Sequence, residues 1–166
     1  MSAQKIPAIA DSVGQLAKLL NERDWLMVTA ESCTGGSVAA ACTDRPGSST
    51  WFQGSVVSYS NQVKTDVLGV PDVVIEQHGA VSTQCAEAMA RGAQLLLQAA
   101  VAVSTTGIAG PDGGSRAKPV GMVCFGFAIG KQLYSDTQYF KGDRSQIRAQ
   151  ASAYALSKLS SYLIDK

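Results

Sequence analysis

The sequence has 166 residues but only one histidine, His78, and this limits the catalytic machinery that the chain can assemble. A Ser-His-Asp triad or a Cys-His pair would have to use this side chain. We expect His78 at the end of a helix, directly before Gly79, where a histidine is more often a favourable contact with the helix dipole. One histidine also excludes a histidine-rich zinc or iron site.

Cysteine pairing motifs are also missing, because the four cysteines are scattered, without a CxxC pair, and lie mostly in apolar segments. This pattern favours reduced, buried thiols in a cytoplasmic protein over a disulfide framework, and it lacks the spacing of a metal site. No paired carboxylate motif calls for magnesium. The sequence therefore predicts neither a metal nor a cofactor.

Charge is scarce and balanced, with 16% charged residues and a formal net charge of +1. No basic stripe or acidic tail indicates a nucleic-acid or membrane-surface partner, although a small anionic ligand fits this balance. No apolar run approaches membrane-spanning length, and residues 1–10 lack the features of a signal peptide. We therefore expect a cytoplasmic protein.

What the chain does contain is a series of helical and strand patterns, with 46% apolar residues, enough for one core. We predict a single α/β domain over residues 1–166, with three α/β/α layers and a mixed sheet whose last hairpin is antiparallel. Helices are expected over 9–20, 36–43, 62–68, 72–77, 83–97 and from 144 onward; strands are expected over 25–30, 54–60, 101–106, 122–129 and 132–140.

Two glycine-containing turns follow predicted strands, at 29–37 and at 107–114, although neither matches the GxxxxGK[ST] or GxGxxG phosphate motif. Such turns present backbone N–H groups to an oxyanion or a phosphate. The simpler interpretation of the first turn is a helix N-cap with glycines that ease a tight bend. The second turn opens a connection of roughly 14 residues, longer than usual between strands.

An acyl-transfer nucleophile is expected on such a turn or loop, and the candidates are Ser32, Cys33, Ser48 and Ser49. Without a usable histidine the general base would be a lysine, which acts as a base only when its pKa is lowered. Lys64 is the lysine placed best for this role.

Lys64 is predicted in the first turn of the helix capped by Asn61, where a cation opposes the helix dipole at a cost of ~0.3–1 kcal/mol. The alternative is an ordinary solvated lysine. Tyr59, just before this helix, is equally well interpreted as a core aromatic. Arg144 also lies at a helix start, where its guanidinium is suited to bind a phosphate or a carboxylate through two hydrogen bonds. The alternative is that Asp143 caps the helix and pairs locally with Arg144.

Seven short motifs follow one another along the chain in an order that is typical of one known family. They are 29–36 (TAESCTGG), 47–49 (GSS), 59–61 (YSN) with Lys64, 79–82 (GAVS), 107–114 (GIAGPDGG), 118–121 (KPVG) and 142–144 (GDR). Together they closely resemble the C-terminal domain of the CinA competence/damage-inducible family, from about residue 16 to 162. Stand-alone members of that family include nicotinamide-nucleotide amidases.

The resemblance implies hydrolysis of the carboxamide of nicotinamide mononucleotide, giving nicotinic acid mononucleotide and ammonia. It further implies a metal-free Ser/Lys pair, with Lys64 as the lysine. Ser32 is our first choice for the nucleophile, with Ser48 or Ser49 in reserve, and Tyr59 is expected to tune or relay the proton.

Binding roles follow as hypotheses from the same scheme. One glycine turn would hold the oxyanion and the other, with Arg144, the phosphate; the residues assigned to binding are Thr34, Gly35, Gly36, Thr106, Gly107, Gly110 and Arg144. Thr106 stands where the family pattern leads us to expect a serine. The alternatives are a catalytically silent nucleotide-binding module and a hydrolase of another small amide. A homo-oligomer is also expected.

Overall fold

The structure, a computed structural model, describes residues 7–166 and confirms the predicted order of elements. The helices are α1 (Ile9–Asn21), α2 (Ser37–Thr43), α3 (Asn61–Asp66), α4 (Asp72–His78), α5 (Thr83–Leu96) and α6 (Arg144–Ile164), with one short 3₁₀ helix, η1 (Ser48–Thr50). The strands are β1 (Met27–Glu31), β2 (Phe52–Val57), β3 (Val101–Gly107), β4 (Met122–Ile129) and β5 (Gln132–Tyr139).

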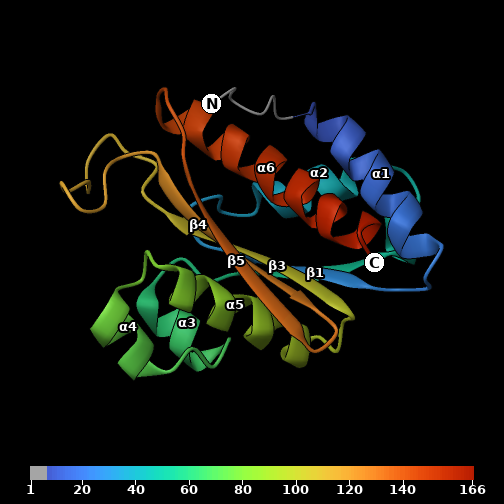
Figure 1. Cartoon of the computed structure of the whole chain (residues 1–166), viewed down its shortest axis with the longest axis horizontal. Coiled ribbons are helices and arrows are strands. Elements are labelled where there is room, and N and C mark those ends of the chain that lie inside the picture. The colour runs from blue at the N-terminus through green and yellow to red at the C-terminus, as the bar shows by residue number, and fades with distance from the viewer. Residues whose placement is uncertain (1–6) are drawn as a thin grey trace.

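The five strands form one sheet in the order β2-β1-β3-β4-β5. Strand β1 lies parallel to both β2 and β3, whereas β4 runs antiparallel to β3, and β5 runs antiparallel to β4. Helices α1, α2 and α6 cover one face, and α3, α4 and α5 lie on the other (Figure 1). The expected three-layer α/β/α architecture with a mixed sheet is therefore confirmed.

Because both faces are covered, β1 is buried along its whole length. Its side chains alternate between two cores: Met27 packs with the α1, α2 and α6 layer, and Val28 and Ala30 pack with the α5 layer. Among residues 7–166, none of the helices combines the length and the apolar character needed to cross a bilayer.

The chain order of the strands reverses beside β1, because β2 lies on one side of it and β3 on the other. In open α/β sheets, a crevice forms beyond the carboxyl ends of the strands at such a point. The residues that follow β1 and end β3 meet there. The first predicted glycine turn and the start of the second are thus brought to the same edge of the sheet.

The segment between β2 and α3 differs from its prediction. Ser60, not Asn61, caps α3, since the Ser60 Oγ accepts a hydrogen bond from the N–H of Val63 at 3.2 Å. The predicted strand over 54–60 ends at Val57, and the chain then turns the carbonyls of Ser58 and Tyr59 toward α3. Ser82 caps α5, and Asp143 caps α6, as the alternative given for Asp143 expected.

Helix α5 approaches the end of the α3 segment closely at Gly92. A Cβ built there would lie 1.9 Å from the carbonyl oxygen of Leu68. Only glycine permits this contact with the backbone two residues beyond α3. The contact therefore helps to fix the helix that carries Lys64.

Gly92→Ala is expected to destabilise the protein by ~1–3 kcal/mol through overpacking, despite the better helix propensity of alanine. Gly14→Ala is the matched control, since Gly14 is also helical but its Cβ would meet only the flexible Arg45 side chain, 3.5 Å from Nη1 and 4.0 Å from Cζ. We expect this control to be neutral or to stabilise by up to ~1 kcal/mol. Urea unfolding of both variants tests the contrast; equal effects would contradict it.

Candidate active site

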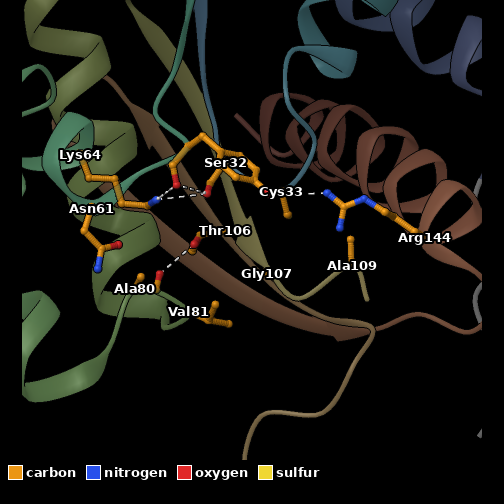
Figure 2. Close-up of a pocket in the computed structure, with 11 residues that line it drawn as sticks. Ser32, Cys33, Asn61, Lys64, Ala80, Val81, Thr106, Gly107, Ala109 and Arg144 are labelled. Atoms are coloured by element: carbon orange, nitrogen blue, oxygen red, sulfur yellow. Dashed lines mark hydrogen bonds between the residues drawn. The ribbon is translucent and has the colours of Figure 1, made fainter. Parts of the chain in front are cut away.

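Two residues far apart in the sequence, Ser32 and Lys64, meet at the carboxyl edge of the sheet. Ser32 directly follows β1, and Lys64 projects from α3. Their Oγ and Nζ atoms lie 3.1 Å apart, within hydrogen-bonding distance (Figure 2). The structure thus joins the first-choice nucleophile to the predicted base.

The side chain of Lys64 is buried, with only 1% of its surface exposed. Burial disfavours the ammonium form and lowers the pKa of Lys64 from its ordinary value of 10.5. The ion pair found within residues 7–166 joins Lys18 to Glu22, so no carboxylate in that part of the chain forms a salt bridge with Lys64. The interpretation of Lys64 as a solvated surface lysine is therefore wrong.

The remaining partners of Lys64 are two carbonyl oxygens. Its Nζ donates to Ser58 O at 2.9 Å and to Tyr59 O at 3.0 Å. A neutral amine has two N–H bonds and one lone pair. When both N–H bonds point to these carbonyls, the lone pair faces the Ser32 hydroxyl, which is the arrangement that a general base requires.

A cavity of about 180 Å³ opens beside this pair, at the edge where β1 and β3 end. Eleven residues line it: Ser32, Cys33, Tyr59, Asn61, Lys64, Ala80, Val81, Thr106, Gly107, Ala109 and Arg144. Most of them are labelled in Figure 2, in which the amide of Asn61 and the guanidinium of Arg144 flank the cavity from α3 and α6.

Three of the binding residues expected from the sequence line this cavity: Thr106, Gly107 and Arg144. The Thr106 hydroxyl donates to Ala80 O at 2.7 Å and so joins the end of β3 to the segment before α5. Asn61 was missed as a cavity residue. Its place in the YSN motif beside Lys64 is the available signal, but the sequence pattern alone predicts a helix cap.

Arg144 reaches across the cavity instead of pairing with its neighbour. Its Nη1 donates to Gly110 O at 2.8 Å, and its Nη2 lies 3.4 Å from the Tyr59 hydroxyl. Asp143 is engaged in the capping box of α6 with Gln146. The side chain of Tyr59 is 62% exposed, so its interpretation as a core aromatic is wrong.

The hydrogen-bond donors of the first glycine turn are not directed into the cavity. The N–H of Gly36 donates to Glu31 Oε2 at 2.9 Å, and the Thr34 hydroxyl donates to the same oxygen at 2.7 Å. The N–H of Gly35 donates to Ser32 O at 3.1 Å. Thr34, Gly35 and Gly36 are therefore engaged within the turn and do not line the cavity.

Ser48 and Ser49 lie at the opposite end of the sheet. They belong to η1, which precedes β2, and the following Trp51 carbonyl accepts from the N–H of Met27 at the start of β1. The five residues of β1 separate them from Ser32, roughly 16 Å at ~3.3 Å per residue. The structure does not bring the two reserve serines to Lys64.

The remaining titratable groups do not assemble a metal site. Within residues 7–166, no cluster of three or more His, Cys, Asp or Glu side chains has the arrangement to hold an ion. His78 ends α4, as predicted; its side chain is exposed, and its carbonyl accepts from Lys118 Nζ at 2.7 Å. The four cysteines are free and buried.

Comparisons with known proteins identify the family of the chain. The family model described as the CinA C-terminal domain matches residues 10–163. The nicotinamide-nucleotide amidohydrolase PncC of Pseudomonas putida is 47% identical over 154 residues, covering 93% of this chain and 94% of that protein. PncC of Escherichia coli K12 is 46% identical over 160 residues, covering 96% of this chain and 95% of that protein.

Solved structures show the same fold. The competence/damage inducible protein CihA of Agrobacterium tumefaciens is 36% identical, has a TM-score of 0.90 and covers 99% of each chain. A CinA superfamily protein of Klebsiella pneumoniae is 32% identical with a TM-score of 0.92, over 96% of this chain and 100% of that chain. On the family match and these relatives, the chain belongs to the CinA C-terminal domain family.

Proposed function

We propose that the protein is a nicotinamide-nucleotide amidase that converts nicotinamide mononucleotide to nicotinic acid mononucleotide and ammonia. The observation that carries the proposal is the 3.1 Å contact between Ser32 Oγ and the buried Lys64 Nζ. Relatives that cover nearly the whole chain are named nicotinamide-nucleotide amidohydrolases. That name supports both the reaction class and the substrate.

In the proposed mechanism, neutral Lys64 takes the proton of the Ser32 hydroxyl as Oγ attacks the carboxamide carbon. The tetrahedral intermediate collapses when Lys64 returns this proton to the nitrogen, which leaves as ammonia. An ester on Ser32 remains. Water then attacks that ester, Lys64 again carries the proton, and the carboxylic acid is released with Ser32 restored.

The oxyanion needs N–H donors beside Ser32, worth ~3–4 kcal/mol per good donor in acyl transfer. The donors at the start of α2 are taken by Glu31, so we place the oxyanion against the backbone of Cys33, the neighbour of Ser32 in the cavity wall. The backbone of the second turn, at Gly107 and Ala109, lines the opposite wall.

Arg144 supplies the positive charge for the nucleotide phosphate in this scheme. Its guanidinium lies at the cavity, is exposed, and keeps donors beyond the one held by Gly110 O. Tyr59 contributes differently from its predicted role: its carbonyl orients Lys64, and its hydroxyl lies by Arg144. Thus we assign Tyr59 to positioning and substrate contact.

The geometry favours this enzyme over a catalytically silent module, since Lys64 is buried beside a serine rather than exposed and distant from one. With that substrate, we propose that the protein acts in the cytoplasm, consistent with its four free, buried thiols. We also propose a homo-oligomer; β2 and β5, the edge strands of the sheet, leave backbone groups for pairing.

Ser32→Ala and Lys64→Met are each expected to lower kcat by about 10³-fold or more, because each removes one half of a unit that acts together. Ammonia release from nicotinamide mononucleotide, assayed with EDTA present, measures the loss. Ser48→Ala and Ser49→Ala are matched controls and should keep wild-type turnover. Full activity of Ser32→Ala, or loss of activity in either control, would contradict the assignment.

The pH dependence should report Lys64. Because the neutral amine is the active form, kcat/KM is expected to fall as the pH is lowered through the Lys64 pKa. The slope should be that of a single group that takes up one proton. Burial lowers that pKa below 10.5, so the fall lies on the acid side of this value. A pH-rate profile with stability checked at each pH tests this; a rate that rises on acidification would contradict it.

Arg144→Gln is expected to raise KM for nicotinamide mononucleotide about tenfold, since it removes a charged contact to phosphate. The same variant should leave kcat/KM for nicotinamide riboside, which has no phosphate, within about twofold. Arg45→Gln, at the far end of α2, is the control and should change neither value. Equal losses on both substrates would exclude a phosphate role.

A further inference from the structure

A buried carboxylate lies directly before the proposed nucleophile. Glu31 is the last residue of β1 and has no exposed surface. Its two oxygens accept five hydrogen bonds, from the hydroxyls of Thr29 and Thr34 and from the N–H groups of Gly36, Val38 and Ala39, at 2.7–3.1 Å. None of these donors belongs to a lysine or arginine.

Three of the five donors are backbone N–H groups at the start of α2. A helix end leaves such groups unsatisfied and attracts an anion. Here the chain supplies its own carboxylate, from the residue next to Ser32. Residues 32–36 therefore close into a turn around the side chain of Glu31, and this places Ser32 at a fixed point of that turn.

A second charged side chain holds the same turn by its carbonyls. Arg148, from α6, donates through Nε to Cys33 O at 3.1 Å and through Nη2 to Thr34 O at 2.9 Å. Gly35 permits this approach, because a Cβ there would lie 3.2 Å from Arg148 Nη2 and its φ of +60° suits glycine. The turn is thus bound by an anion on its N–H groups and by a cation on its carbonyls.

We propose that Glu31 and Arg148 are positioning residues that hold the Ser32 hydroxyl against Lys64. The inference rests on the proposed role of Ser32 as nucleophile. Neither residue lines the cavity, and neither hydrogen bonds to Lys64, whose Nζ contacts are Ser32, Ser58 and Tyr59 within residues 7–166. Both act through the turn and not on the substrate.

A positioning role has a kinetic signature. Displacement of a reacting group by about 1 Å costs about 10²-fold in rate without loss of substrate contacts. Glu31→Ala is therefore expected to lower kcat about 10²-fold with KM changed less than about threefold. The same variant should lower, by a similar factor, the rate at which a fluorophosphonate probe labels Ser32, followed by peptide mass spectrometry.

Chemical rescue separates positioning from stability alone. Truncation of Glu31 leaves a pocket with five donors, which formate can fill as a carboxylate. We expect formate to restore Ser32 labelling and kcat in Glu31→Ala. Formamide at the same concentration, and sodium chloride at the same ionic strength, should restore neither. Glu87→Ala, which removes a carboxylate that accepts from Ser135 on β5, is the control and should show neither loss nor rescue.

Arg148→Lys gives a second readout that does not depend on Glu31→Ala folding well. The variant keeps the charge but loses the paired hydrogen bonds to the two carbonyls. It should lower the Ser32 labelling rate and kcat about tenfold, with KM unchanged. Wild-type labelling rates in both variants, or formate that raises the Tm of Glu31→Ala without restoring labelling, would overturn the proposal. If the wild type left nicotinamide mononucleotide intact while both variants still showed the predicted labelling changes, that result would refute the proposed substrate but support the positioning role.

Discussion

The site depends on the burial of one amine, Lys64, whose hydrogen-bond partners are two backbone carbonyls and a serine hydroxyl. Burial without a paired carboxylate disfavours the ammonium form and lowers the pKa of the lysine. The two carbonyls then fix the direction in which the amine accepts a proton. In the proposed mechanism, a lysine in this setting takes the role that histidine has in the Ser-His-Asp triad.

The fold provides these conditions through its strand order. Strand β1 delivers Ser32 to the edge of the sheet where β3 also ends, and α3, held close to α5 at Gly92, delivers Lys64. On the other face, Glu31 and Arg148 hold the turn that carries Ser32. Ser32 is thus tied to one helical layer and Lys64 to the other, and the sheet between them sets their separation.

Much of this arrangement was predictable from local patterns. Hydrophobic periodicity and turn residues predict the helices and strands to within a few residues, and the shortage of histidine favours Lys64 as the base. Ser32 was favoured by its turn after a strand. The resemblance of ordered motifs indicated the family, which the comparisons confirm.

The sequence was least informative where a role depends on how the folded chain directs a donor or an acceptor. Glu31 occupies the donors of the glycine turn, and no local pattern distinguishes such a carboxylate from a solvated one. Ser48 stays in reserve behind Ser32 at the level of sequence, because the distance along β1 cannot be judged without knowing the register of the sheet. Tyr59 contributes its carbonyl to Lys64, a role that its side-chain chemistry does not indicate.

The central claim is that Lys64 is a neutral base, and direct titration of this residue by NMR tests it most directly. The ¹³Cε resonance of Lys64, assigned by comparison with Lys64→Met, is expected to titrate below the ordinary pKa of 10.5. The other lysines serve as internal references. A Lys64 resonance that titrates at or above 10.5 would contradict the account.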